Sequence, residues 1–261
     1  TYHLVCLFAR LPPKQNSAPL PAYSAMPYDQ NMSDPILIAH DSILAPAGLE
    51  NNDIDRLLGQ VSSPAIDAAD VFQSSRLQSW VLEDGIIKDG SFNIERGAGV
   101  RAVSGEKTGF AYSDELQFPA LLQASQAARA IARSGGQGRV QVARTAGIHR
   151  LYEPLNPVES LTDQEKVALL HRVDDEARRQ DRRVKQVTAS LVSVQDVVLI
   201  AGSDGHLSGD VRPLVRLNVT VIAEDGDRRE QGSSGGGART DLGWFLAADR
   251  ALQYARDAAH Q

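Results

Sequence analysis

The histidines are the first residues to consider for chemistry, because imidazole is a common metal ligand and general base. No two of them stand three or four residues apart, and the H-E-x-x-H pattern of zinc enzymes does not occur. His171 stands one helical turn before Asp174 and Asp175, and we interpret it as a salt-bridge partner on a helix face. The other histidines are His3, His40, His149, His206 and His260.

The one cysteine, Cys6, leaves this chain without a disulfide framework or a cysteine-based zinc site. Such sparing use of cysteine indicates a reducing, cytoplasmic compartment, and we interpret the Cys6 thiol as incidental and unreactive. The sequence also lacks G-x-S-x-G, the motif that presents a serine nucleophile. Nucleophilic catalysis therefore has no candidate residue in the sequence.

Glycine-rich stretches were considered as phosphate-binding loops. Gly97-Ala98-Gly99 does not continue into G-x-G-x-x-G, and residues 134–138 follow a predicted helix instead of preceding one. Residues 233–237 (SSGGG) do precede a predicted helix but lack the lysine of a P-loop. We interpret them as a flexible turn, with close backbone approach to a ligand or to another part of the protein as the alternative.

Adjacent carboxylates occur at Glu83-Asp84 and Asp174-Asp175, and nothing in their spacing separates them from ordinary surface charge. The residues alone therefore predict no catalytic and no metal-binding residue, and they leave substrate-binding residues unknown.

The bulk composition is that of a globular protein. The chain has 261 residues, a formal net charge of −6 and 42% hydrophobic residues, enough for one large or two modest cores. The mild acidity argues against a nucleic-acid surface, and no apolar run approaches the roughly 20 residues of a membrane span. A basic run is interleaved with carboxylates and reads as a solvated helix face; it comprises Arg178, Arg179, Arg182, Arg183 and Lys185.

Residues 1–31 differ from the rest of the chain. They hold five of the twelve prolines, and Met26 and Met32 lie at their far edge. We predict that the native protein starts at Met32 and that 1–31 is a non-native or disordered leader. A natural disordered arm is the alternative.

Residues 79–114 predict antiparallel β-structure. Three turn dipeptides, Asp84-Gly85, Asp89-Gly90 and Ser104-Gly105, separate short runs in which apolar and polar residues alternate. A first strand is expected at 66–73, and further strands at 184–194, 196–201 and 211–223. In the last of these, Arg212, Arg216, Asn218 and Thr220 should occupy the wetter face.

Helices are expected to pack on these strands. A short helix within 36–58, with an apolar stripe at Ile54, Leu57 and Leu58, would be capped by Asn52 or Asp53, and an amphipathic helix covers 118–133. Thr162 and Glu165 form a capping box for a helix that reaches about residue 183, with an apolar stripe at Val167, Leu170, Val173 and Ala177. A closing helix through Trp244 to Ala255 would be capped by Asp241.

The resulting fold class is α+β, with twisted, mostly antiparallel sheets and helices packed on one face, in two lobes. Pro154 and Pro157 mark a plausible hinge between them. We therefore expect one domain at 32–150 and a second at 151–261.

Four segments together resemble one family. They are SWVLEDGIIKDGSFNIERGAGVRAVSGEKTGFAYSDEL at 79–116, RVDDEARRQDRRVKQVTASL at 172–191, the stretch 203–239, and DLGWFLAADRALQYARDAA at 241–259. Their wording resembles TldD-type subunits of the TldD/PmbA (TldD/TldE) zinc metallopeptidase family, over the N-terminal half of such a subunit. By this resemblance, 32–150 is the family's N-terminal α+β domain and 151–261 is a middle domain, truncated before the catalytic C-terminal domain.

The resemblance implies a cytoplasmic peptidase that uses zinc and forms a heterodimer with its paralogue PmbA/TldE. It further implies digestion of unfolded peptides, maturation of a microcin precursor and degradation of an antitoxin; an older description of the family is modulation of DNA gyrase. The family's metal motif, H-E-x-x-x-H with a cysteine as further ligand, belongs to the C-terminal half. We therefore expect this chain to be inactive alone and to form the cleft and the partner interface. A non-catalytic binding or scaffold protein of the same fold is the alternative.

Overall fold

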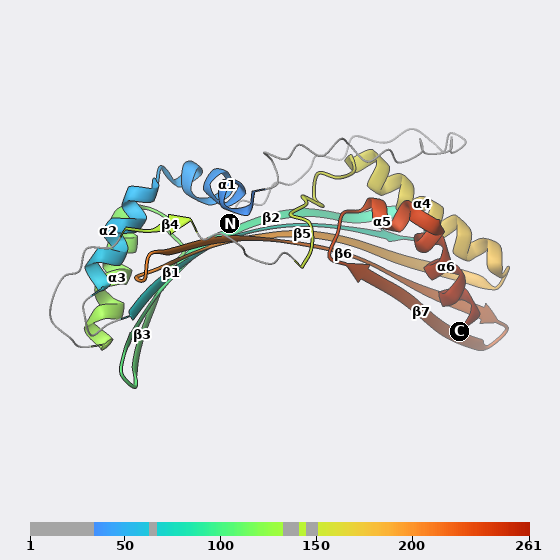
Figure 1. The fold of residues 1–261 in the computed structure, drawn as a ribbon. Coiled ribbons are helices and arrows are strands. Elements are labelled where there is room, and N and C mark those ends of the chain that lie inside the picture. The colour runs from blue at the N-terminus through green and yellow to red at the C-terminus, as the bar shows by residue number, and fades with distance from the viewer. Residues whose placement is uncertain (1–33, 63–66, 133–140, 145–150) are drawn as a thin grey trace.

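The computed structural model describes residues 34–62, 67–132, 141–144 and 151–261. The predictions for 1–31 and for the glycine run 134–138 lie outside these residues. A single arched sheet of seven strands runs through the molecule, and the helices lie on its convex side (Figure 1). The strands are β1 (Asp67–Glu83), β2 (Ile86–Ser104), β3 (Lys107–Ser113), β4 (Ala143–Arg144), β5 (Val184–Gly202), β6 (His206–Asp225) and β7 (Arg228–Ala238).

The sheet has the order β3-β2-β1-β5-β6, and both β4 and β7 pair with the outer side of β6. All pairs are antiparallel except β4 with β6. The predicted antiparallel sheet with helices on one face is therefore confirmed. Two separate lobes are not seen, because β1 from the first half of the chain pairs along its length with β5 from the second.

The strands are longer than predicted. Asp84-Gly85 forms the expected turn, with φ of 50° and 71°. Asp89-Gly90, in contrast, lies inside β2, beside a register shift at Val81/Leu82. A side-chain carbon at Gly90 would lie 2.9 Å from Cζ3 of Trp80, so this glycine makes room for an indole ring. The break expected near residue 195 is also wrong, because β5 runs unbroken and the Gln195 side chain is buried.

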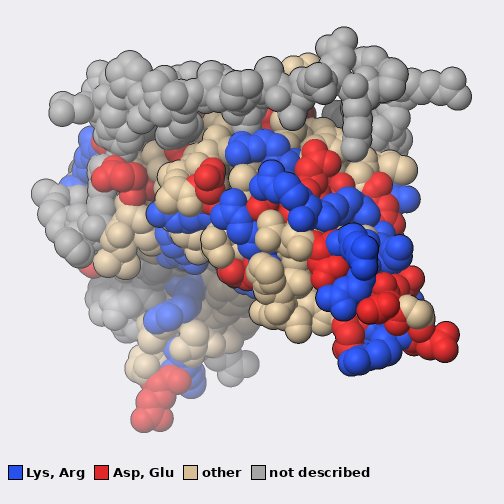
Figure 2. Space-filling view, turned by 90° about the vertical axis from the view of Figure 1, so that its right-hand side faces the viewer, with Lys and Arg blue, Asp and Glu red and all other residues tan. Residues whose placement is uncertain are grey.

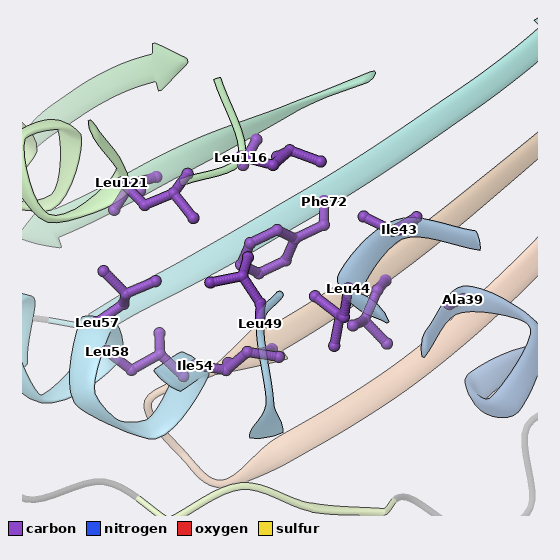
Figure 3. Packing of buried hydrophobic residues seen from close by; sticks show 14 of the residues in the cluster. Ala39, Ile43, Leu44, Leu49, Ile54, Leu57, Leu58, Phe72, Leu116 and Leu121 are labelled. Carbon is purple, nitrogen blue, oxygen red and sulfur yellow. The ribbon is translucent and has the colours of Figure 1, made fainter. Parts of the chain in front are cut away.

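The first helical group covers one end of the sheet. It comprises α1 (Pro35–Ala39), a π-helical turn (His40–Leu44), a 3-10 turn (Ala45–Ala47), α2 (Asn51–Val61) and α3 (Phe118–Ala132). The N-cap of α2 is Glu50 and not Asn52 or Asp53; Asp53 is the reciprocal partner of the capping box. Phe72 of β1 meets leucines and isoleucines from these helices in a hydrophobic cluster (Figure 3).

The second helical group covers the other end. Helix α4 (Asp163–Gln180) begins at the Thr162–Glu165 capping box as predicted. The predicted single closing helix is wrong: α5 (Gly243–Leu246) and α6 (Arg250–His260) are separated by a 3-10 turn (Ala247–Asp249). Ala248 and Asp249 have φ of 53° and 51°, so the chain cannot continue as one helix there. Phe245, Leu170 and Leu217 lie in this second cluster.

The two faces of the sheet thus differ, and we call them the helical face and the open face. Along β6 the buried residues Val211, Val215, Leu217, Val219 and Val221 lie on the helical face. The alternate residues Arg212, Arg216, Asn218 and Thr220 lie on the open face, as predicted, and none of these four is buried. None of the helices in the described ranges is long and apolar enough to cross a membrane.

Candidate functional site

Zinc, the metal that the resemblance implies, would need several His, Cys, Asp or Glu side chains close together. Within the described ranges no three His, Cys, Asp or Glu residues gather closely enough to hold a metal ion. His171 lies on α4 close to Asp174, but Asp174 is committed to Arg178 at 3.1 Å. The described residues therefore do not fit a zinc site, and no catalytic step through a metal is derived from them.

The adjacent carboxylates Glu83 and Asp84 hold the β1–β2 turn against β5 and α4. Asp84 accepts hydrogen bonds from Arg178 at 2.9 Å and from the backbone N–H of Val187 at 3.2 Å. Glu83 accepts from the Gln186 side chain at 2.7 Å. Burial raises the pKa of Asp174, although the Arg178 guanidinium acts in the opposite direction. These groups are thus structural partners, which local spacing alone could not reveal.

The basic run around α4 forms ion pairs with neighbouring acids. Arg183 pairs with Asp181 at 2.7 Å and with Asp225 at 3.5 Å. The hydrogen bonds from Arg183 lower the pKa of Asp181 to about 2. Figure 2 shows side chains of both charges intermixed over this end of the molecule.

Lys166 is a polar anchor that the sequence reading missed. Its side chain is 3% exposed. Its Nζ donates to the Gln78 amide oxygen at 2.5 Å and the Val158 carbonyl at 2.7 Å, and lies 3.3 Å from Asp163. Lys166 rather than the predicted Val167 shares the buried stripe with Leu170 and Val173. The helical spacing of residues 166, 170 and 173 predicts one shared face, but the charge of Lys166 argues against placing it on a buried face.

The glycine-rich segment before the last helices is strand β7, so its prediction as a flexible turn is wrong. A side-chain carbon at Gly232 would collide with the Ala258 carbonyl, and one at Gly236 with the Tyr254 hydroxyl. The glycines therefore allow α6 to lie directly on β7. The alternative prediction, close approach to another part of the protein, is confirmed.

A ladder of polar side chains crosses the open face where β5 and β6 pair. Arg212 donates to Asp210 at 2.7 Å and is paired in register with Asp196. Arg216, four residues further along β6, donates to Asn218 at 3.1 Å. Leu214 lies between the two arginines and is 37% exposed. This surface presents guanidinium groups and an apolar side chain together, which suits contact with another polypeptide.

A hollow of about 280 Å³ opens on the helical face beside β2. Its lining is Pro46, Ala47, Arg96, Asp114, Leu116 and Gln117. Arg96 Nε and Ser74 Oγ are both buried, and neither has a hydrogen-bond partner among the described residues. Ser74 and Arg96 are paired in register between β1 and β2. Unpaired buried donors of this kind are rare and favour a missing acceptor.

Comparison with known proteins identifies the family that this chain resembles. Residues 71–132 match the family model described as PmbA/TldA metallopeptidase domain 1, and residues 156–261 match the PmbA/TldA metallopeptidase central domain. The chain is 44% identical over 228 residues to the metalloprotease TldD homolog of Haemophilus influenzae, which covers 85% of this chain and 47% of the relative. It is 38% identical over 210 residues to the TldD homolog of Buchnera aphidicola from Acyrthosiphon pisum, covering 80% and 44% respectively. The chain spans about half the length of the curated relatives it matches.

Solved structures share the fold. A candidate modulator of DNA gyrase from Thermotoga maritima superposes with a TM-score of 0.63 at 17% identity, over 80% of this chain and 46% of that one. TldE from Thermococcus kodakarensis gives 0.58 at 14% identity, over 78% and 47%. With matches to two successive domain models and to curated TldD homologs, the chain belongs to the PmbA/TldD metallopeptidase family.

Proposed function

We propose that this chain is the N-terminal part of a TldD-type zinc metallopeptidase subunit, with domains at 32–150 and 151–261. In this proposal the chain forms the wall of the substrate cleft and the interface with a paralogous PmbA/TldE subunit. Residues outside the chain, in a third domain, supply the zinc ligands and the general base. The subunit acts in the cytoplasm on unfolded peptides, including peptide precursors and antitoxins.

The observation that carries the proposal is the asymmetry of the sheet. The described helices lie on one face (Figure 1). The other face presents the Arg212–Leu214–Arg216 ladder. The relatives are about twice as long as the aligned part, so an additional domain is available to lie against this face. A polar sheet face opposite a catalytic domain would contact an extended peptide along several strands at once.

The open face can be tested by charge reversal in the full-length subunit with its partner. The double variant Arg212→Glu, Arg216→Glu should lower kcat/KM for an unfolded peptide about tenfold, because both guanidinium groups would no longer attract substrate. The matched control, Lys107→Glu with Arg228→Glu, makes the same charge change at two exposed positions away from the ladder. Equal activity of the two double variants, at equal melting temperature, would contradict the proposed cleft.

A non-catalytic scaffold of the same fold is the second candidate, favoured by the lack of a ligand cluster in the described ranges. The reading frame downstream of residue 261 separates the two. An H-E-x-x-x-H motif in that frame supports the peptidase, and an immediate stop codon supports the scaffold.

A further inference from the structure

Strand β2 has a long outer edge without a partner strand among the described residues. β3 pairs with β2 only from Ala98 to Ser104, although β2 begins at Ile86. Residues 86–97 therefore present backbone N–H and C=O groups along one side of the sheet. Edge strands of natural proteins are usually short, twisted or covered, because a long exposed edge pairs readily with another extended chain.

On the helical face, this edge carries two apolar side chains followed by a basic one. Phe92 and Ile94 are 41% and 46% exposed. They share that face with Arg96, because Arg76, Ser74 and Gln78, their register partners in β1, alternate with open-face residues. The edge thus presents two large apolar side chains and then a guanidinium, each two residues apart.

The Arg96 end of the edge coincides with the hollow. β3 stops at Ser113, opposite Ala98, and Asp114 and Leu116 then turn away to line the hollow. The unpaired Arg96 Nε and Ser74 Oγ lie at this point, buried and without an acceptor among the described residues. A carboxylate is the acceptor that a guanidinium binds best. Asp114 lines the same hollow but makes no ion pair with Arg96 in this structure.

We propose that the β2 edge is a binding site for an extended acidic peptide, which adds to the sheet antiparallel to β2 and continues the line of β3. An Asp or Glu of the peptide lies opposite Arg96. The residues two and four positions toward the peptide's C-terminus lie opposite Ile94 and Phe92. The recognised pattern is therefore acidic-x-apolar-x-apolar, with affinity from main-chain hydrogen bonds and specificity from alternate side chains. This inference rests on the proposed function in one respect, that the occupant is a peptide substrate.

Binding can be measured without cleavage, by fluorescence anisotropy of a labelled peptide with the 261-residue chain. A peptide carrying Asp, Val and Leu at the three positions in a Ser/Thr background should bind, and replacing Asp by Lys should weaken binding about tenfold. Arg96→Gln should abolish this preference for Asp over Lys. Asp114→Asn is the matched control, because it removes a negative charge from the same hollow. It should leave binding unchanged or strengthen it. Equal affinity for the Asp and Lys peptides, or an unchanged preference in Arg96→Gln, would overturn the proposal.

Backbone methylation supplies a readout that side-chain contacts alone would not give. Methylating peptide nitrogens at alternate positions should abolish binding for one set, whose N–H groups face β2, and preserve it for the other. Equal effects of the two sets would overturn strand addition. Pairing of two copies through this edge is the competing occupant: a dimer that Ile94→Asp converts to a monomer of unchanged melting temperature would also overturn the proposal.

The outcomes separate this inference from the proposed function. Cleavage by the full-length pair that is insensitive to Arg96→Gln, with no peptide binding at the edge, removes the inference alone. Peptide binding at the edge by a full-length pair that never cleaves peptides removes the peptidase proposal alone.

Discussion

The two hydrophobic clusters on the helical face are built differently. The cluster under α2 and α3 is almost entirely aliphatic and aromatic, and the buried polar side chains beside it in the described part are the uncharged Ser74 and Ser125. The cluster under α4 and α6 is bordered by three buried charged residues, Lys166, Asp174 and Glu176. Lys166 and Glu176 are held by partners from other elements, and Asp174 is held by Arg178 of the same helix, which also binds Asp84 of the β1–β2 turn. Helices α2 and α3 are therefore positioned on the sheet by apolar packing, whereas α4 and α6 are also held by specific polar bonds.

Polar bonds also hold the segment that connects the two helical groups. The connector before α4 lies on the helical face, and three bonds hold it there. The Val158 carbonyl accepts from Lys166, Glu159 lies 3.6 Å from Arg76, and Ser160 accepts from the Leu242 backbone. Apolar packing tolerates small shifts, whereas these bonds, together with the hydrogen bond from Lys166 to Gln78 of β1, fix the position of α4 on the sheet.

Lys166→Met should have the largest effect. It keeps the length of the side chain but leaves the Val158 carbonyl and the Gln78 amide oxygen unpaired in a buried site. We expect a loss of about 3 kcal/mol in the free energy of unfolding, measured by urea titration. Lys185→Met, at an exposed position, should change it by less than about 0.5 kcal/mol. A small effect at both positions would remove the distinction between the two ends.

Glu176→Gln should come next. Glu176 is 3% exposed and accepts from Arg256 of α6 at 2.6 Å and from Gln180 at 2.9 Å, besides its ion pair with Arg179. Because Arg256 is one-third exposed, we expect a loss of about 2 kcal/mol rather than the full cost of a buried pair. Arg179→Ala removes a mostly exposed partner and should cost less than about 0.5 kcal/mol. Similar losses in the two variants would show that the α4–α6 contact does not depend on burial.

At the aliphatic end, Ser125→Ala should have the opposite sign. Ser125 is fully buried on α3, and its Oγ has no partner among the described residues. Removing an unpaired hydroxyl and raising helix propensity should stabilise the protein by about 1 kcal/mol. Thermal and urea unfolding of the two proteins measure this directly. A loss of stability would reveal a hydrogen bond at Ser125 and weaken the contrast between the clusters.

The smallest effect concerns pH. Asp174 has a raised pKa, so between the unfolded and folded pKa values the folded state holds more protons, and its contribution to stability falls as pH rises. Asp181 has a lowered pKa, so its contribution is present above the unfolded pKa and is lost as pH falls toward about 2. The stability difference between wild type and Asp174→Asn should therefore fall with pH, and that for Asp181→Asn should rise. Slopes of the same sign would contradict these environments.

Local sequence predicted the kinds of element better than their lengths. Alternation and turn dipeptides identified the antiparallel strands, and Thr162 with Glu165 located the start of α4. Asp89-Gly90 was misread because its strand conformation depends on Trp80, ten residues away in the neighbouring strand. The break at Ala248 and Asp249 has no glycine to signal it, so periodicity alone predicted one helix.

The candidate sites were less predictable than the fold. Arg96 is a candidate binding residue because it pairs in register with Ser74 and because β3 ends beside it. Both features depend on the tertiary structure. The glycines of β7 were recognised as unusual, but α6 lies against them only in the folded chain. The open-face arginines were predicted, since strict alternation along one strand is sufficient to assign a face.

The decisive measurement compares peptide cleavage by the 261-residue chain with that by the full-length subunit and its PmbA/TldE-type partner, both supplied with zinc. An unfolded fluorogenic peptide serves as substrate, and a chelator as control. We expect cleavage only by the full-length pair, and we expect the chelator to abolish it. Chelator-sensitive cleavage by the 261-residue chain alone would contradict the proposal that this chain forms the cleft wall and that residues outside it bind the metal.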